Sequence, residues 1–147
     1  MNALAGDRIP VYGDGAQIRN WLHVEDFCDA IDLVLERGRA GEIYNAGGPD
    51  ELTNVEVVNR IIDLAGVSDA RIEHIEDRPG HDRRYSLASD RLEELGWKAQ
   101  VTFGEGIEKT FAWYRDNPQW WEPIRSGEYR DYYVRHYGQQ LGGDPTR

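Results

Sequence analysis

The sequence has few of the residues that mark secreted, metal-binding or membrane proteins. Its 147 residues include one cysteine, Cys28, so no disulfide framework can form, and no cysteine or histidine cluster has the spacing of a zinc site. Cys28 itself is expected to be a small hydrophobe on a helix face. No run of about 18 apolar residues occurs, and no charged leader precedes an apolar run near Met1. We therefore expect a soluble, cytoplasmic protein with no membrane partner.

Positive charge and glycine-rich loops are also scarce. The 17 Lys and Arg residues are outnumbered by 27 Asp and Glu residues, which gives a formal net charge of -10 at pH 7. Such a surface repels the backbone of a nucleic acid, so no nucleic-acid partner is expected. No G-x-G-x-x-G motif occurs near the start of the chain, and Gly47 and Gly48 lack the spacing of a dinucleotide loop.

Hydrophobic spacing predicts a mixed α/β fold. Helices are expected over 24–36, 53–65, 89–95 and 102–117. Strands are expected over 8–12, 17–24, 42–48, 71–76 and 85–89, the first two as a hairpin. Thr53 with Glu56 and Thr102 with Glu105 have capping-box spacing, and Ser89 is expected to cap the short helix between them.

The predicted elements favour one main domain. We expect residues 1–118 to form a binding domain and residues 119–147 to form an aromatic-rich helical tail that packs on it. Trp120 and Trp121 are expected to anchor that tail. Asp26 is expected to be a favourable charge in the first turn of its helix and not a catalytic acid.

An arginine-rich turn is the strongest functional signal in this acidic chain. The segment DRPGHDRRY, residues 77–85, places Arg78, Arg83 and Arg84 around a Pro-Gly turn that also contains His81. Guanidinium groups stay charged and can bind one anionic group through two parallel hydrogen bonds, so the turn suits a phosphate or diphosphate. A solvated turn with surface salt bridges is the alternative interpretation.

Four segments carry a family resemblance. In chain order they read IPVYGDGAQIRNWLHVEDFCDAI, YNAGGPDELTN, DRPGHDRRYSLASDRLEELGW and FGEGIEKTFAWY. They resemble the carboxyl-terminal part of the dTDP-glucose 4,6-dehydratases, which are extended short-chain dehydrogenases/reductases. Asn20 stands where that family commonly has Asp, a mild departure. The resemblance implies a substrate-binding part with short strands and four to five helices, without the amino-terminal Rossmann core.

The resemblance also implies a site for the thymidine diphosphate of dTDP-glucose or a related nucleotide sugar. The matching positions are Pro10, Val11, Tyr12, Arg19, Asn54, Asp77, Arg78, Pro79, Gly80 and His81. Arg19 and Arg78 are expected to converge on the diphosphate, and the helix start at Asn54 to offer free N–H groups to an anion. Tyr12 either offers its ring to the base or sugar or packs in the core. His81 either orients the turn or touches phosphate.

The resemblance further implies that the chain is inactive alone. The family oxidises the sugar with tightly held NAD, removes water and returns the hydride, using a cofactor loop, a Tyr-x-x-x-Lys pair and acidic residues of the amino-terminal part. No Tyr-x-x-x-Lys occurs in this sequence. We therefore expect no catalytic residue, no metal site and no cofactor bound by this chain, with NAD belonging to the parent enzyme.

An exposed apolar edge is the last expectation. By the resemblance, the helix over 24–36 and the strand at 43–46 belong to the edge of the amino-terminal domain's sheet, so alone they expose apolar surface and an unpaired strand. This predicts association with that amino-terminal half, or self-association. Two alternatives stay open, namely a fragment of a UDP-sugar epimerase or decarboxylase and a non-catalytic protein-interaction module.

Overall fold

The computed structural model describes residues 1–68 and 71–127, which fall in two units. One unit spans residues 2–111, and the other contains Met1 and the chain from residue 112 onward. Four tyrosines of the predicted helical tail lie outside the described residues: Tyr129, Tyr132, Tyr133 and Tyr137. Within the described ranges, no helix has the length and apolar character needed to cross a membrane.

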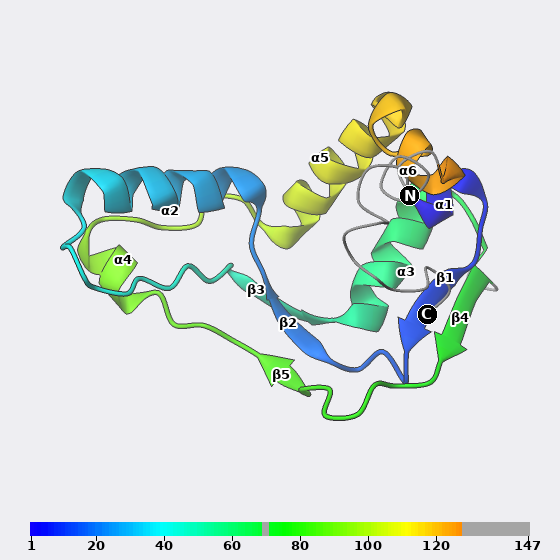
Figure 1. Ribbon diagram of the computed structural model, residues 1–147, viewed down its shortest axis with the longest axis horizontal. Helices are drawn as coiled ribbons and strands as arrows, with labels where there is room; N and C mark the ends of the chain where they lie inside the picture. Colours follow the sequence, from blue (N-terminus) through cyan, green and yellow to red (C-terminus); the bar gives the residue numbers. More distant parts are fainter. Residues whose placement is uncertain (69–70, 128–147) are drawn as a thin grey trace, which may run out of the picture. The chain divides into compact units, whose positions relative to one another are not determined.

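Short strands and helices alternate along the chain, which confirms the predicted mixed α/β class (Figure 1). The helices are α1 (Asn2–Ala5), α2 (Val24–Arg37), α3 (Asn54–Ala65), α4 (Asp90–Glu94), α5 (Phe103–Asp116) and α6 (Glu122–Ser126), with a short 3-10 helix, η2 (Pro118–Trp120). The strands are β1 (Ile9–Tyr12), β2 (Ile18–Trp21), β3 (Asp50–Thr53), β4 (Ile72–Ile75) and β5 (Arg84–Tyr85).

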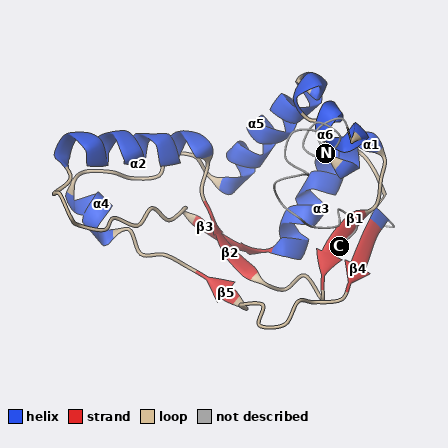
Figure 2. Ribbon diagram, viewed as in Figure 1, coloured by secondary structure: helices blue, strands red, loops and turns tan. Residues whose placement is uncertain are grey.

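The strands form two small sheets, drawn in red in Figure 2. β1 pairs in parallel with β4, while β2 lies between antiparallel β3 and parallel β5. The predicted hairpin is therefore wrong, since its two strands lie in different sheets. After β1, the Gly15 N–H bonds to the Tyr12 carbonyl and the Gly15 carbonyl accepts from Val55 N–H. These bonds turn the chain away before a ladder between β1 and β2 can form.

Residues 42–48 form an irregular segment where a strand was predicted (Figure 2, tan). A strand needs a neighbouring strand to complete its hydrogen-bond ladder, and none of the described strands pairs with this segment. Its backbone finds a side chain instead, because the Gly47 N–H donates to Ser89 Oγ at 2.8 Å. The predicted capping role of Ser89 is therefore wrong, as its hydroxyl makes no cap hydrogen bond to α4. Ile43 is left 75% exposed.

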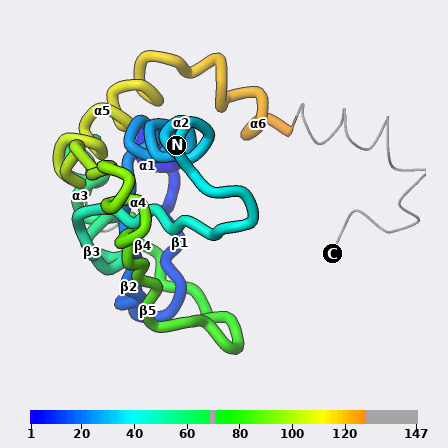
Figure 3. The backbone as a smooth tube through the Cα atoms, turned by 90° about the vertical axis from the view of Figure 1, so that its left-hand side faces the viewer, coloured from blue at the N-terminus to red at the C-terminus, as the bar shows by residue number. Residues whose placement is uncertain are grey.

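A small apolar core lies between α2, α4 and this irregular segment. Ala30 of α2 packs with Leu92 and Trp97, all of them buried. Figures 1 and 3, drawn at right angles to each other, both place α4 and the segment after α2 on one side of that helix. Cys28 of α2 is exposed.

Asp26 is the buried polar anchor of this region. Only 2% of the residue is exposed, and its two carboxylate oxygens accept from the backbone N–H groups of Gln100 (2.9 Å) and Val101 (3.0 Å). Its own carbonyl accepts from Trp97 Nε1 at 3.1 Å. The prediction of a simple first-turn charge therefore missed its main role, which is to tie the start of α2 to the loop before α5.

Capping boxes begin α3 and α5, as predicted. Thr53 Oγ accepts from the Glu56 N–H while the Glu56 carboxylate accepts from the Thr53 N–H, and Thr102 and Glu105 repeat this reciprocal pair. α5 ends just before Pro118, because proline cannot continue a helix.

The unit that begins at residue 112 has its own aromatic anchor. Trp121 is buried and its Nε1 donates to the Tyr114 carbonyl at 2.8 Å. Trp120 is 65% exposed and contacts Trp113 at 5.9 Å between ring centroids. Of the two tryptophans predicted to anchor the tail, the structure buries one.

The buried carboxylate gives a first prediction. Asp26→Ala leaves the N–H groups of Gln100 and Val101 without an acceptor, so we expect the free energy of unfolding to fall by about 3 kcal/mol in urea denaturation near neutral pH. Asp29→Ala, at an exposed position of the same helix, should change it by less than about 0.5 kcal/mol. Equal losses in the two variants would contradict the anchoring role.

Candidate nucleotide-diphosphate site

The arginine-rich segment contains a type II Pro-Gly turn. The His81 N–H donates to the Arg78 carbonyl at 3.2 Å, which closes the turn. Pro79 supplies the fixed backbone angle of the second position, and Gly80 has the φ of +70° that the third position requires. All three turn residues from Arg78 to Gly80 are exposed.

Strand pairing brings this turn to the end of the chain's first sheet. β4 runs beside β1 and β5 runs beside β2, both in parallel, so the connection 76–83 follows the same path as the connection 13–17. The two connections are joined where the Ile18 N–H donates to the Arg83 carbonyl at 2.8 Å. Arg19, at the second position of β2, therefore lies beside the turn.

His81 lies between Asp77 and Arg19. Its Nδ1 is 2.7 Å from Asp77 Oδ1, and its Nε2 is 3.0 Å from Arg19 Nη2. Asp77 is also bound by Gln17, whose Nε2 donates to Asp77 Oδ2 at 2.9 Å. Four polar residues from distant parts of the sequence thus form one continuous chain, Gln17, Asp77, His81 and Arg19.

This arrangement lowers the pKa of Asp77 below its ordinary value. The largest cause is the hydrogen bond with His81. Desolvation acts in the opposite direction, and bonds from the Arg78 N–H and the Gln17 amide add to the lowering. Asp77 is therefore held as a carboxylate at neutral pH.

Arg19 is anchored within the protein. Its Nη1 donates to the Ile18 carbonyl at 2.7 Å, and its Nη2 donates to the Asp82 carbonyl at 3.1 Å. The guanidinium carbon lies 4.4 Å from the centroid of the Tyr85 ring, within the range of a cation–π contact.

Arg78 lies beside a different aromatic ring, that of Tyr12, and its guanidinium is freer. Its side chain has no hydrogen-bond acceptor among the residues that the structure describes, and its guanidinium carbon is 5.9 Å from the centre of the Tyr12 ring. A hydrogen bond to Asp82 raises the pKa of Tyr85, and both Arg19 and Arg78 partly offset that rise. The two arginines lie near each other, because Arg19 contacts His81 and the His81 ring packs against Tyr12, the ring that Arg78 approaches.

The other two arginines of the segment are paired with carboxylates. Arg83 Nη1 lies 3.3 Å from Asp14 Oδ1, and Arg84 forms a two-point pair with Glu51 at 3.0 and 2.7 Å. Surface salt bridges therefore account for Arg83 and Arg84, whereas the Arg78 guanidinium has no acceptor among the described residues.

The predicted residues of β1 differ in their exposure. Tyr12 is 47% exposed, and the edge of its ring faces His81 with 6.0 Å between the ring centres, so it is not a core residue. Val11 is buried at 4% exposure, which removes its side chain from any exposed site, while Pro10 is exposed.

The start of α3 does not offer the free N–H groups that were predicted. In order, the N–H groups of Asn54, Val55 and Glu56 donate to the carbonyl of Gln17 (3.0 Å), the carbonyl of Gly15 (2.9 Å) and the hydroxyl of Thr53 (3.3 Å). Hydrogen bonds from Thr53 also lower the pKa of Glu56, which keeps a negative charge at this helix start. The anion-binding expectation is wrong for these backbone groups. Asn54 still lies next to a site residue, because its N–H donates to the Gln17 carbonyl.

Sequence reasoning assigned no role to Gln17 or Tyr85. Tyr85 had a usable signal, because an aromatic residue next to two arginines commonly stacks with a guanidinium. Gln17 had none, since its importance comes from burial at 2% exposure and from a partner 60 positions away.

The Gly47–Gly48 pair does not have the geometry of a dinucleotide-binding loop. A Cβ on Gly48 would lie 1.5 Å from the Trp21 carbonyl oxygen, so this glycine allows two stretches of the chain to approach each other and does not cradle a phosphate. Asn20 Nδ2 donates to the Gly48 carbonyl at 2.8 Å, a bond that an ionised aspartate could not make. No group of three or more metal-ligating side chains is assembled in residues 1–68 and 71–127.

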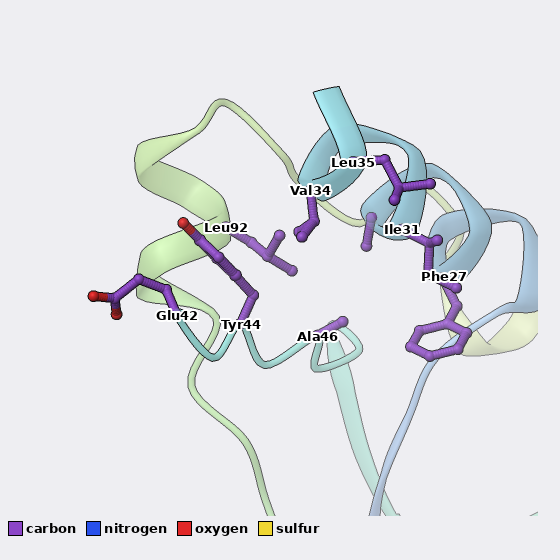
Figure 4. Close-up of a pocket in the computed structure, with 9 residues that line it drawn as sticks. Phe27, Ile31, Val34, Leu35, Glu42, Tyr44, Ala46 and Leu92 are labelled. Carbon is purple, nitrogen blue, oxygen red and sulfur yellow. The ribbon is translucent and has the colours of Figure 1, made fainter. Parts of the chain in front are cut away.

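A second feature is an apolar groove of about 280 Å³ beside α2 (Figure 4). It is lined by Phe27, Ala30, Ile31, Val34, Leu35, Glu42, Tyr44, Ala46 and Leu92. Three of the helix residues are largely open to solvent, with exposures of 49% for Phe27, 45% for Ile31 and 79% for Leu35. Figure 4 shows these side chains on the face of α2 above Ala46. The predicted apolar surface is thus present without the predicted strand.

Known proteins are similar to this chain in sequence and in fold. The family model described as GDP-mannose 4,6 dehydratase matches residues 1–110. The dTDP-glucose 4,6-dehydratase of Streptomyces niveus is 49% identical over 126 residues, which are 85% of this chain and 38% of that protein. A crystal structure of the Bacillus anthracis dTDP-glucose 4,6-dehydratase in complex with NAD is 49% identical with a TM-score of 0.78, over 84% of this chain and 39% of that one.

More distant structures define the class. A UDP-glucose 4-epimerase from Thermotoga maritima, solved with UDP-glucose, is 27% identical with a TM-score of 0.72, over 78% of this chain and 37% of that one. The fold is therefore that of the corresponding part of the extended short-chain dehydrogenases/reductases. The chain belongs to the GDP-mannose 4,6 dehydratase family, and the resemblance to dTDP-glucose 4,6-dehydratases is confirmed. It spans about 38% of the length of the curated relatives that it matches.

The Asp77–His81 contact gives a second prediction. His81→Phe removes the largest cause of the lowered pKa, so the pKa of Asp77 should rise toward the ordinary value of about 3.9. Because the folded-state pKa is lowered, the stability contributed by Asp77 is present at neutral pH and is lost as the pH falls through that pKa. Carbon-13 NMR titration of the carboxyl groups measures the change. Asp14, whose pKa is lowered mainly by the Ala16 N–H, serves as the internal control and should not move.

Proposed function

We propose that the chain is the carboxyl-terminal, nucleotide-sugar-binding part of a dTDP-glucose 4,6-dehydratase. The observation that carries this proposal is that both arginines lie beside one pair of rings. Arg19 contacts His81, whose ring packs against Tyr12, and the Arg78 guanidinium lies 5.9 Å from the centre of the Tyr12 ring. Two guanidinium groups and two aromatic rings on one surface match the chemistry of a nucleoside diphosphate, whose phosphates are anionic and whose base and sugar present flat or apolar faces.

The two arginines take different parts in binding. Arg78 is exposed and has no hydrogen-bond acceptor among the described residues, so it supplies a two-point fork to a phosphate. Arg19 has five N–H donors, of which three are directed at Ile18, His81 and Asp82. It therefore gives single hydrogen bonds and a fixed positive charge.

The parent reaction converts dTDP-glucose to dTDP-4-keto-6-deoxyglucose and water with the help of NAD. The Bacillus anthracis relative was solved in complex with NAD, but the Gly47–Gly48 pair of this chain does not form a dinucleotide loop. NAD and the reacting groups accordingly belong to the part of the parent enzyme that has no counterpart in this sequence. The role of this chain is to bind and orient the nucleotide diphosphate, and alone it is inactive.

The base is proposed to be thymine and not uracil. The dTDP-glucose 4,6-dehydratases are 49% identical to the chain, whereas the UDP-glucose 4-epimerase of Thermotoga maritima is 27% identical. An epimerase fragment is therefore the less favoured interpretation. Competition between dTDP and UDP for the same site distinguishes the two.

Affinity for dTDP gives a third prediction. Arg78→Ala should weaken dTDP binding about tenfold with little change in stability, because its charge-assisted hydrogen bonds are made only to the ligand. Arg19→Ala should weaken binding and also lower the free energy of unfolding by about 1–3 kcal/mol, because it loses contacts within the fold. NMR titration with dTDP and urea denaturation provide the two readouts.

Arg83→Ala is the matched control for that experiment. It removes the same charge from the same segment, but its guanidinium is paired with Asp14. Its affinity for dTDP should stay within about twofold of the original chain. The proposal fails if the original chain shows no dTDP binding at millimolar ligand, or if all three alanine variants bind equally well.

We also propose that the apolar groove beside α2 packs against the remaining part of the parent enzyme. Exposed apolar surface of this kind is unusual on a monomer, and the neighbouring residues 42–48 have a backbone that no described strand pairs with. When the chain is alone, two copies are expected to associate through the same surface.

Self-association gives a fourth prediction. Ile31→Asp places a charge in the groove, so it should lower the average mass at high protein concentration in sedimentation experiments. Asn59→Asp, at an exposed position of α3, adds the same charge away from the groove and should leave the mass unchanged. A monomeric original chain at all concentrations, or equal effects of the two substitutions, would contradict this use of the groove.

A further inference from the structure

We propose that α4 blocks one edge of residues 42–48 and so keeps this segment from building open-ended stacks of strands between copies of the chain. This role goes beyond the proposed self-association, because it sets the size at which association stops. Three features carry it: the strand-forming sequence of the segment, its lack of a strand neighbour, and two side chains at the start of α4 that bind its backbone.

The segment 42–48 has the sequence of a strand but no strand neighbour. It reads EIYNAGG, in which Ile43 and Tyr44 are residue types that favour strands. None of the described strands pairs with it, and Ile43 is 75% exposed. A segment of this kind is a template on which a strand of another chain can add.

Two side chains at the start of α4 bind the backbone of this segment near its two ends. Ser89, which precedes α4 and is 9% exposed, accepts from the Gly47 N–H at 2.8 Å. Arg91 Nη1 donates to the Ile43 carbonyl at 3.0 Å and to the Glu42 carboxylate at 2.6 Å. One end of the segment thus has its donor occupied, and the other end its acceptor.

Both of these backbone groups would lie on the same edge of the segment if it became a strand. In a strand, the N–H and C=O of one residue point to one neighbour, and those of the next residue point to the opposite neighbour. Ile43 and Gly47 are separated by an even number of positions, so they share an edge. Tyr44 and Ala46 would face the other edge, which these α4 side chains do not bind.

The apolar core keeps α4 beside the segment. Leu92 of α4 is 1% exposed and packs with Ala30 of α2, and Tyr44 and Ala46 pack against this buried cluster. Figure 4 shows the Leu92 side chain next to that of Tyr44. α4 therefore cannot leave this edge without opening the core.

Blocking one edge changes the kind of association that is possible. A strand with two open edges accepts a neighbour on each side, so copies add without limit. A strand with one open edge accepts a single neighbour, and two copies that pair through it close the contact. Association of the chain through this segment is therefore expected to stop at pairs.

The double variant Ser89→Ala with Arg91→Ala, called the edge variant below, frees the blocked edge. In sedimentation velocity at high protein concentration, the fraction of protein in particles larger than a pair should rise at least about fivefold. Infrared spectra in the amide I region should show added strand pairing in those particles. Arg91→Ala alone, at an exposed position, keeps the bond from Gly47 to Ser89 and should give a smaller rise.

Thr53→Ala with Arg60→Ala is the matched control. Thr53 Oγ also accepts from a backbone N–H, that of Glu56, and Arg60 also pairs with a carboxylate, that of Glu108. Both contacts involve α3 and not residues 42–48, so this control should assemble like the original chain. Adding Ile43→Lys to the edge variant should reverse its assembly, because a charge on an open edge opposes strand pairing.

The outcomes separate the blocking role from the proposed self-association. Particles no larger than a pair in the edge variant, or equal growth of particles in the control variant, would overturn the blocking role. An original chain that stays monomeric while the edge variant builds large particles would support the blocking role and reject the self-association alone.

Discussion

Two parallel strand pairings determine where the candidate site forms. Because β4 lies beside β1 and β5 lies beside β2, the connection between β4 and β5 must follow the connection between β1 and β2. That constraint places the Pro-Gly turn next to Arg19, although Arg19 and His81 are 62 positions apart. Each pairing joins only a few residues. Side-chain hydrogen bonds between the two connections are therefore also needed to hold the turn beside Arg19.

Those side-chain bonds hold the two arginines of the site in different ways. The hydrogen-bonded chain of Gln17, Asp77 and His81 holds the Arg19 guanidinium in place. The exposed turn bears Arg78, whose guanidinium has no acceptor among the described residues. A fixed charge lowers the entropic cost of binding, and a free fork supplies the strong hydrogen bonds. Under the proposed function, these local positive charges are arranged in advance for an anion, although the chain as a whole is acidic.

Local signals in the sequence predicted much of the fold but little of the long-range pairing. The capping box at Thr53 and the apolar spacing of α2 act over a few residues, so they were readable. The hairpin and the strand at 42–48 were wrong, since strand formation depends on a partner that local sequence does not specify. For the candidate site, the motif predicted Arg19, Arg78 and His81, and the structure brings these residues together. The bonds from the first N–H groups of α3 to the backbone of residues 15–17 could only be seen in three dimensions.

The central claim is that Arg19 and Arg78 bind one diphosphate together. The most direct measurement follows the arginine side-chain NMR signals during a titration with dTDP. The account predicts that the Arg19 and Arg78 signals shift together and saturate at the same ligand concentration, while that of Arg83 stays in place. Binding that shifts other residues and leaves either Arg19 or Arg78 unchanged would contradict the account.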